Sequence, residues 1–570
     1  MSQDQEQDQG QAGTAATAAG PGAAPAGATA ARAEAGAVAA DAGRSRWRRF
    51  WRSLTRPWRW AALAAGALPV LAFPALNLEF LAWLGIVPGL LVVRAAPSGR
   101  EAAVRGWWLG TGYLLTALYW LTPNLGPALL LVTIVIGAPW AGFGYAAWRL
   151  LRGPGGGPPG LRRCLAAIVV LPSCWVVIDW LRSWQGFGGP WAVFGASQWQ
   201  HPVVLSLAAV GGVWLVTFVL VAANTGIAAG LTAAGWGGRA AGAAAALLAI
   251  AAGPAAFALT AGEYAVRPTG HVTLLLVQPG LEPSPSSRLN EGIRLTLAAR
   301  PANLVIWGES SVGYDLNADH KITRRLQRLS ARIGVPVLVS QDAVSPAGAK
   351  SKVAALIGPA GIEQSYTKTR LVPFGEYIPF RSALGWLSSI SRAAPQNMVT
   401  GAGAHVLHAT VRGGRRLDFG VLICFESAFP DMSRVDANRG AQIIVYQTSD
   451  STFQGSWAPE QHASLAALRA AETGRPAVQA ALTGDSAAFD ARGRLLAWAG
   501  TTDRGVRRVR LALPPDRVRT PFDRYGDYVP WFAITVTVLA ALAALISLNS
   551  TRGGRRKTAG GRPPGTDERS

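Results

Sequence analysis

The sequence predicts a polytopic α-helical membrane protein of about eight spans that carries one inserted α/β domain. Three observations predict this class. Half of the 570 residues are hydrophobic and only 15% are charged, with a mean hydropathy of +0.22. Apolar runs of about 20 residues, the length needed to cross a bilayer, recur through the first half of the chain. A long polar stretch of mixed strands and helices then separates them from one last apolar run.

The N-terminal segment precedes every apolar run. Residues 1–43 are rich in Gln and Asp and then in Ala, Gly and Pro, without apolar periodicity, which is typical of a disordered tail. No apolar core follows the first Met, so this segment is not a signal peptide. Seven spans are expected within 44–261, an eighth at 529–548, and a basic tail at 549–570. The first seven are expected at 58–76, 78–94, 104–122, 127–148, 163–181, 203–234 and 240–261.

The sixth of these spans is unusually long. At 203–234 it is long enough to tilt in the bilayer or to contain a break near Asn224.

Charge along the chain predicts the orientation. The 54 Lys and Arg exceed the 32 Asp and Glu, for a net charge of +22. Much of the excess lies beside apolar segments and no nucleic-acid module is visible, so it indicates membrane topology rather than nucleic-acid binding. Arg-rich connections alternate with nearly uncharged ones, which places both termini in the cytoplasm and 262–528 outside. The Arg-rich connections carry Arg94, Arg100 and Arg105, then Arg149, Arg152, Arg162 and Arg163, then Arg239.

The segment 262–528 has the pattern of a globular α/β domain. Short, continuously apolar runs of this kind indicate a sheet that is covered on its faces. Strands are expected at 271–278, 302–307, 335–341, 352–358, 417–424, 441–447 and 476–482, and helices at 317–333 and 459–473.

Three reactive side chains stand at the ends of expected strands: Glu309 in IWGESS, Lys368 in SYTKTRLVPFGEYIP and Cys424 in GVLICFES. Each alone fits an ordinary role, as a capping carboxylate, a surface lysine or a buried thiol. Cys164 and Cys174 share an apolar stretch, so Cys424 has no disulfide partner in its own domain. Together the three residues supply what acyl transfer needs, namely a base, an ammonium for the oxyanion and a thiol nucleophile.

The order of these residues and their local sequences resemble the nitrilase (carbon–nitrogen hydrolase) superfamily, whose fold is an αββα sandwich. Within it, the chain resembles the apolipoprotein N-acyltransferase family, in which a nitrilase domain is inserted between seven spans and one. The resemblance covers roughly residues 58–548. It rests on KTRLVPFGEYIPF at 368–380, CFES at 424–427 and WLRSWQGFGGPWAVFGASQ at 180–198.

The resemblance implies a role for each matching residue. Glu309 is implied as the general base, Lys368 as the oxyanion stabiliser and Cys424 as the acyl nucleophile, with Glu376 and Glu426 supporting the active site. It implies that the enzyme takes a fatty acyl chain from a membrane phospholipid through a Cys424 thioester. The acceptor is then the α-amine of the N-terminal S-diacylglyceryl-cysteine of an apolipoprotein, without metal or organic cofactor, in the bacterial inner membrane.

The chain also departs from the family pattern. Gly308 stands where the family usually has Pro, and Ser449 and Thr452 replace an Asn and a Trp. The segment 284–292 lacks the aromatic that relatives carry near the substrate. These departures leave the three catalytic candidates untouched and bear on lipid and peptide preference.

Two other functions stay open: a membrane-bound nitrilase-type amidase, and a catalytically idle scaffold for another lipid-modifying enzyme. Eight spans are more than a tether needs, and the complete set of three reactive residues argues against an idle scaffold. A transporter is disfavoured because the spans lack paired charges beyond Asp179. Six aromatic residues are expected to form an interfacial belt or gate: Trp180, Trp184, Phe187, Trp191, Phe194 and Trp199.

Overall fold

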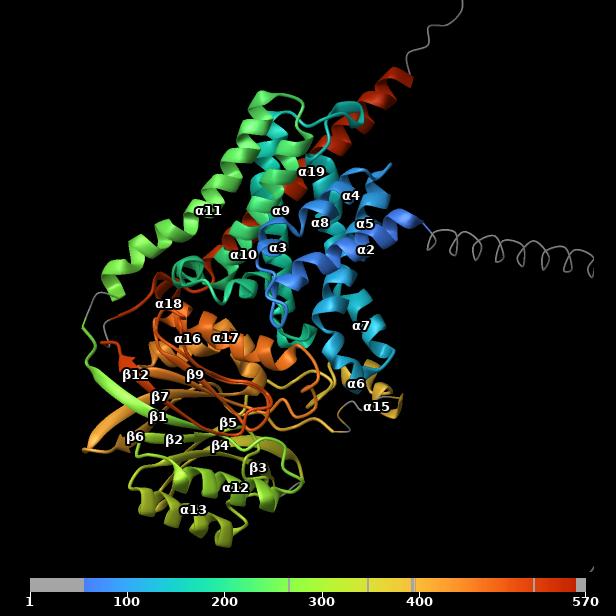
Figure 1. Ribbon diagram of the computed structural model, residues 1–570. Helices are drawn as coiled ribbons and strands as arrows, with labels where there is room; N and C mark the ends of the chain where they lie inside the picture. The colour runs from blue at the N-terminus through green and yellow to red at the C-terminus, as the bar shows by residue number, and fades with distance from the viewer. Residues whose placement is uncertain are drawn as a thin grey trace, which may run out of the picture. The chain divides into compact units, whose positions relative to one another are not determined.

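The computed structural model describes residues 56–264, 267–345, 348–390, 394, 396–515 and 518–559. The expected tail at 1–43 lies outside the described residues, as does the end of the chain from 560. The described chain contains a group of long helices and a two-sheet sandwich (Figure 1).

We call the helices that come first in the chain, together with the last helix, the long-helix part, which also includes some short helices. They are α2 (Pro57–Ala67), α3 (Phe80–Leu84), α4 (Val87–Arg94), α5 (Gly99–Ala117), α6 (Thr122–Leu125), α7 (Ala128–Ile136), α8 (Trp140–Leu150), α9 (Leu161–Arg182), α10 (Pro202–Thr232), α11 (Trp236–Tyr264) and α19 (Tyr528–Ala559). Among the described residues, α9, α10, α11 and α19 are long and apolar enough to cross a membrane. The pair α7 and α8, bent by 47°, makes a fifth if it is one span. Of the other three expected spans, one falls on α5, which has 19 residues but is not among the helices that are apolar enough, and two fall on shorter helices, so all three stay predictions.

The sixth expected span is α10, and its break is not at Asn224. The helix is interrupted at Gly211 and Gly212, where Gly212 has φ 69° and ψ −177°. The N–H of Val213, which the break leaves without a helical acceptor, donates to Glu472 Oε1 at 2.8 Å. Asn224 lies in regular helix and instead bonds to the backbone around the start of α4. Two adjacent glycines tolerate the non-helical dihedrals that a break needs, which explains its position.

The remaining elements form two six-stranded sheets that pack face to face. The first has the order β12 (Gly505–Leu513), β1 (Gly270–Gln278), β2 (Leu304–Trp307), β3 (Val337–Val344), β4 (Lys350–Gly358) and β5 (Gly361–Thr367). The second has the order β11 (Leu495–Ala499), β10 (Ser486–Phe489), β9 (Ala477–Ala481), β8 (Ile443–Thr448), β7 (Arg415–Ile423) and β6 (Val406–Val411). Strands β2, β8, β9 and β10 are buried along their whole length, because both faces of each sheet are covered.

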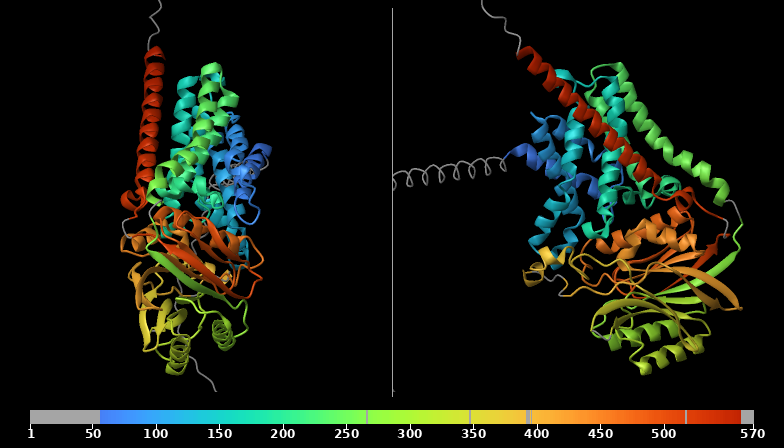
Figure 2. Two further views of the ribbon diagram at one scale, coloured as in Figure 1. Left: turned by 60° about the vertical axis from the view of Figure 1, so that its left-hand side comes forward. Right: turned by 180° about the vertical axis from the view of Figure 1, so that it is seen from behind.

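Helices cover the outer face of each sheet. α12 (Pro285–Ala298) and α13 (His320–Ile333) pack on the first sheet, and α16 (Pro430–Asn438) and α17 (Ala458–Thr473) pack on the second. The layers therefore follow the order αββα, which confirms the nitrilase-like sandwich. α16 and α17 lie on the side of the long helices, and α12 and α13 lie at the far side (Figures 1 and 2).

The ends of central strands from both sheets meet at one place. Gln447, near the end of β8, donates through Nε2 to the carbonyl of Trp307 at the end of β2, at 2.8 Å. Glu309 N–H donates to the carbonyl of Thr448 at 3.1 Å. Residues that follow strands of different sheets are thereby gathered into one site.

Candidate active site

Glu309 is held at the junction of the two sheets. It follows β2 by two residues, and its backbone is fixed to β8 by the bond to Thr448. The residue is 5% exposed, and its Oε1 accepts a hydrogen bond from Lys368 Nζ at 3.2 Å. The next residue, Ser310, has φ 54°, so the chain turns sharply there and leaves the carboxylate facing the lysine.

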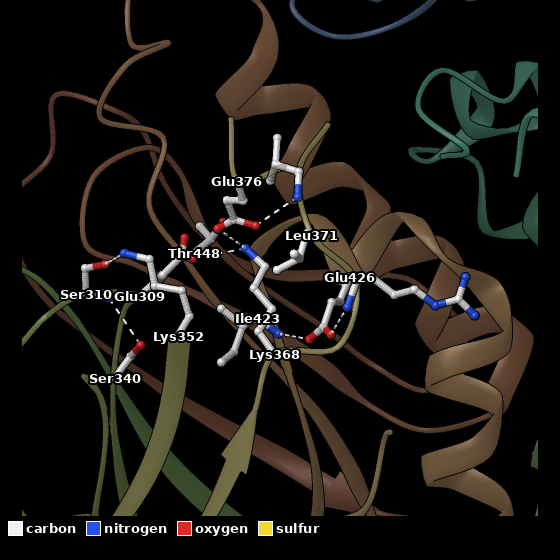
Figure 3. A network of polar contacts seen from close by, with 12 residues as sticks. Glu309, Ser310, Ser340, Lys352, Lys368, Leu371, Glu376, Ile423, Glu426 and Thr448 are labelled. Atoms are coloured by element: carbon white, nitrogen blue, oxygen red, sulfur yellow. Dashed lines mark hydrogen bonds and ion pairs between the residues drawn. The ribbon is translucent and has the colours of Figure 1, made fainter. Parts of the chain in front are cut away.

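Lys368 is fully buried and lies between two carboxylates. It follows β5 directly, and its backbone N–H donates to the carbonyl of Lys352 at 2.9 Å. Its Nζ contacts Glu309 Oε1 at 3.2 Å and Glu376 Oε1 at 2.8 Å (Figure 3). Burial alone would lower the pKa of the Lys368 ammonium, but the nearby charges of Glu309, Glu376 and Cys424 outweigh it and raise that pKa well above its usual value. Lys368 is therefore a permanent buried cation.

Glu376 orients that cation. One of its oxygens accepts from Lys368, and the other accepts from the N–H of Val372 at 2.8 Å. The carbonyl of Glu376 accepts from the N–H of Met398 at 2.9 Å. The loop that follows Lys368 thus folds back on itself and supplies a second carboxylate to the lysine.

Glu426 joins the lysine loop to the turn that carries Cys424. Its Oε1 accepts from Tyr366 Oη at 2.8 Å, from the N–H of Thr369 at 2.6 Å and from the N–H of Arg370 at 2.9 Å. Its Oε2 accepts from the N–H of Ile423 at 2.7 Å. Burial raises the pKa of Glu426, and these four hydrogen bonds partly offset the rise. Glu376 therefore contacts the side chain of Lys368, whereas Glu426 contacts the backbone next to Lys368 and next to Cys424.

Cys424 lies at the first position of a short 3₁₀ turn, Cys424–Ala428, directly after β7. Its φ of 56° is in the left-handed region, which is unfavourable for a residue other than Gly. The side chain keeps some exposure, unlike those of its neighbours. Burial raises the pKa of the Cys424 thiol well above its usual value, the carboxylate of Glu309 raises it further, and Lys368 lowers it. The resting thiol is thus protonated and needs a base before it can attack.

The structure adds groups that the sequence did not single out. Lys352 Nζ bonds to Ser310 Oγ and Asp342 Oδ1, next to Glu309. His462 in α17 is buried and bonds through Nδ1 to Asp450 Oδ1 at 3.0 Å. A lysine in a strand and a histidine in a helix carry no motif of their own, so only the fold reveals them. Among the described residues, no group of three His, Cys, Asp or Glu side chains could hold a metal ion.

An apolar pocket adjoins the Cys424 turn. Residues of the long-helix part and of the catalytic domain line it together. Its lining includes Trp120, Ile136, Phe187, Trp191, Val372 and Phe425. Phe425 follows Cys424 directly, so the pocket reaches the turn that carries the thiol, while Cys424 itself does not line it.

The six residues of the expected aromatic belt differ in burial, and Trp180 is half-buried, with its Nε1 donating to Asp527 Oδ2 at 3.2 Å. Trp184 and Phe187 are 60% and 46% exposed, as a belt or gate requires. Trp191, Phe194 and Trp199 are buried, which contradicts a role in an exposed belt. Trp191 instead stacks on Phe425 with the rings tilted by 17°. Trp191 and Trp199 pack against rings of the catalytic domain, whereas Phe194 packs against Tyr113 and Trp175 within the long-helix part.

Comparison with known proteins matches this architecture. A family model described as "Apolipoprotein N-acyltransferase N-terminal domain" matches residues 65–226, and one described as "Carbon-nitrogen hydrolase" matches residues 243–514. An "Apolipoprotein N-acyltransferase" of Caulobacter vibrioides is 30% identical over 561 residues, covering 90% of this chain and 99% of the relative. One from Rhizobium meliloti is 31% identical over 487 residues, covering 78% and 87%. One from Geobacter metallireducens is 26% identical over 536 residues, covering 85% and 94%.

Two solved structures are similar to somewhat less than half of this chain. An amidase from Nesterenkonia sp. is 21% identical, covers 44% of this chain and 94% of its own, and has a TM-score of 0.32. A carbon–nitrogen hydrolase from Helicobacter pylori is 14% identical, covers 45% and 94%, and has a TM-score of 0.34.

Proposed function

The chain belongs to the apolipoprotein N-acyltransferase family, and we propose that it moves a fatty acyl chain from a membrane phospholipid to the N-terminal α-amine of a diacylglyceryl-modified apolipoprotein. The observation that carries the lipid substrate is the apolar pocket, which residues of the long-helix part and of the catalytic domain line together, and which reaches Phe425 in the turn that carries Cys424. A small polar amide would gain little from such a pocket, whereas an acyl chain gains about 0.8 kcal/mol for each CH₂ that it buries.

The first half-reaction forms a thioester. Glu309 takes the proton of the Cys424 thiol, and the thiolate attacks the ester carbonyl of the phospholipid. The ammonium of Lys368, oriented by Glu376, stabilises the oxyanion of the tetrahedral intermediate. When the intermediate collapses, the protonated Glu309 returns its proton to the leaving alkoxide, which departs as a lysophospholipid.

The second half-reaction transfers the chain to the acceptor. The α-amine of the acceptor attacks the thioester carbonyl, and Glu309 removes a proton from the attacking nitrogen. The C–S bond then breaks, the amide is released and the Cys424 thiolate recovers the proton. No metal or organic cofactor enters this sequence of steps.

The topology that we infer rests on the charge pattern along the chain and on the position of the candidate active site within 262–528. We infer eight spans, with both termini in the cytoplasm, 262–528 outside, and the protein in the bacterial inner membrane. Reporter or cysteine-accessibility tags at positions 40, 300 and 560 test this arrangement. A cytoplasmic tag at position 300 would contradict the function as well as the topology, because the lipoprotein acceptor lies outside.

A thioester assay tests the function. Phospholipid alone is expected to acylate Cys424, neutral hydroxylamine is expected to release the chain, and a lipopeptide with a free α-amine is expected to discharge it. Glu309→Gln is expected to block acylation, and an N-acetylated lipopeptide is expected to leave the thioester intact. An acyl chain on another residue, or N-acylation by Cys424→Ala at the wild-type rate, would refute the proposal. Discharge by water as fast as by the free amine would favour an amidase.

A further inference from the structure

A second lysine, Lys352, contacts both the segment that carries Lys368 and the turn that follows Glu309. Lys352 lies in β4, where its carbonyl accepts the backbone N–H of Lys368 at 2.9 Å. Its side chain points to the other side, where Nζ donates to Ser310 Oγ at 2.6 Å (Figure 3). Nζ also donates to Asp342 Oδ1 at 2.6 Å. Ser310 directly follows Glu309. One residue therefore contacts the backbone of the buried lysine and the turn that carries the carboxylate.

The contacts around Ser310 form a closed triangle. Ser310 Oγ accepts from Lys352 and donates to Asp342 Oδ1 at 2.9 Å. Asp342 and Lys352 are direct partners across the antiparallel pair β3 and β4, so the register of the sheet fixes their ion pair. Lys352 is the only donor of the triangle that carries a charge.

The turn at Ser310 needs this support. Its φ of 54° is in the left-handed region, where a residue other than Gly is strained and persists only if its surroundings hold it. The N–H of Ser310 donates to Ser340 Oγ at 3.2 Å, and its carbonyl accepts from Arg288 Nη1 at 2.8 Å. With Lys352 and Asp342 on the hydroxyl, every polar group of Ser310 has a partner.

Lys352 remains charged in this position. Burial would lower the pKa of its ammonium, but Glu309 and then Asp342 and Glu376 attract it, and the net effect raises that pKa. Its positive charge therefore attracts the carboxylate of Glu309 as well as that of Asp342. The charged and titratable groups that act together with Glu309 are Lys368, Lys352, Cys424 and His462.

We propose that Lys352 is a positioning residue of the catalytic centre, which holds the Ser310 turn and, through its charge, keeps the Glu309 carboxylate aimed at Cys424. This inference rests on the proposed role of Glu309 as the general base. Lys352 itself contacts neither the thiol nor the reacting acyl group.

The test measures activation of the thiol without any lipid. Full-length protein in detergent is treated with iodoacetamide from pH 5 to 9, and alkylation of the peptide that contains Cys424 is followed by mass spectrometry. We expect Lys352→Met to slow alkylation about tenfold at neutral pH and to shift the profile to higher pH by about one unit, because a neighbouring cation is lost. Lys352→Arg keeps the charge and is expected to restore most of the rate. Lys350→Met removes an exposed charge from the same strand and is the matched control.

Two further variants make the prediction specific. Asp342→Asn removes the carboxylate that neutralises Lys352, so the profile is expected to shift in the opposite direction, to lower pH. Asp342 is 35% exposed, so this variant is expected to fold even if Lys352→Met does not. In a Glu309→Gln background, Lys352→Met is expected to produce no further shift, because the base through which it acts is gone.

The outcomes separate this inference from the proposed function. A Lys352→Met profile that coincides with that of Lys350→Met overturns the inference, as does an equal loss in Lys352→Met and Lys352→Arg without a shift. For Asp342→Asn, an unchanged profile or a shift to higher pH overturns it as well. The proposed function instead fails if wild-type protein forms no thioester with phospholipid, whatever the alkylation profiles are.

Discussion

Replacement of Glu426 by Gln isolates the role of one carboxylate that binds two loops. In the native site, Glu426 accepts four hydrogen bonds between 2.6 and 2.9 Å, three on Oε1 and one on Oε2. A Gln side chain has one acceptor oxygen and one NH₂ donor. If its oxygen stays with Thr369 and Arg370, its NH₂ faces the N–H of Ile423, and two donors oppose each other without an acceptor.

The expected cost follows from these contacts. A hydrogen bond to a charged group contributes about 1.5–3 kcal/mol and a neutral one about half of that, so one lost and three weakened bonds would cost roughly 4–7.5 kcal/mol. Gln avoids burial of a charge, and this gain offsets part of the loss. We therefore expect Glu426→Gln to lower the free energy of unfolding by about 2–4 kcal/mol. Because Ile423 precedes the strained Cys424, we also expect acylation of Cys424 to slow about 10- to 100-fold.

Thermal unfolding in detergent and the thioester assay measure both effects. The matched control is Asp431→Asn, which removes a carboxylate from the same region but from a half-exposed pair with Arg370. Such a pair contributes about 0–1 kcal/mol, so this variant is expected to resemble wild type. The reasoning is refuted if Glu426→Gln unfolds and acylates like Asp431→Asn.

The other predictions concern the oxyanion, a buried acid and the helix break. Lys368→Met is expected to leave the protein folded and to reduce turnover about 10²–10³-fold in the lipopeptide assay, and near-normal turnover would remove it from the site. Burial raises the pKa of Asp436 from 3.8 to about 8, so the stability from its bound proton is complete below pH 3.8 and is lost as pH rises through 8. Asp436→Asn, which mimics the protonated acid, is therefore expected to melt higher than wild type at pH 9, and a lower melting temperature would contradict this. At Gly212 a Cβ would lie 2.6 Å from the Phe522 ring at a φ of 69°, so Gly212→Ala is expected to cost about 3 kcal/mol or more in thermal unfolding, whereas Gly237→Ala is not.

Much of the fold could be predicted from local pattern. All seven expected strands and both expected helices of the catalytic domain are present, because continuous apolar runs and amphipathic periodicity determine them. The strands that were missed are β5, β6, β10, β11 and β12. Several of these alternate in burial or are short, and β12 carries three arginines, so the apolar pattern is interrupted. They lie at or next to the edges of the sheets, where pairing rather than composition decides the structure.

The candidate site was predictable only in part. Glu309, Lys368 and Cys424 follow strands whose ends could be read from the sequence, and the structure brings their charges into mutual range. The partners of Glu426 could not be read, because Tyr366 and Ile423 become neighbours only when β5 and β7 are placed in different sheets. Lys352 was missed for the same reason, since its role depends on the pairing of β4 with β3.

The burial of helix α17 indicates that the catalytic domain packs against the long-helix part and is not merely connected to it by the chain. Along almost its whole length α17 is buried, because β9 and β10 pack on one side and α10 packs on the other. A helix that is buried on all sides belongs to the interior of a protein, yet in an isolated sandwich this layer would face solvent. Two of its buried polar residues take partners from the long-helix part: Gln461 accepts from Trp191 Nε1 at 3.0 Å, and Glu472 accepts from Val213 at the break of α10. Since His462 of the same helix lies beside the Cys424 turn, the long helices complete the core against which that turn packs.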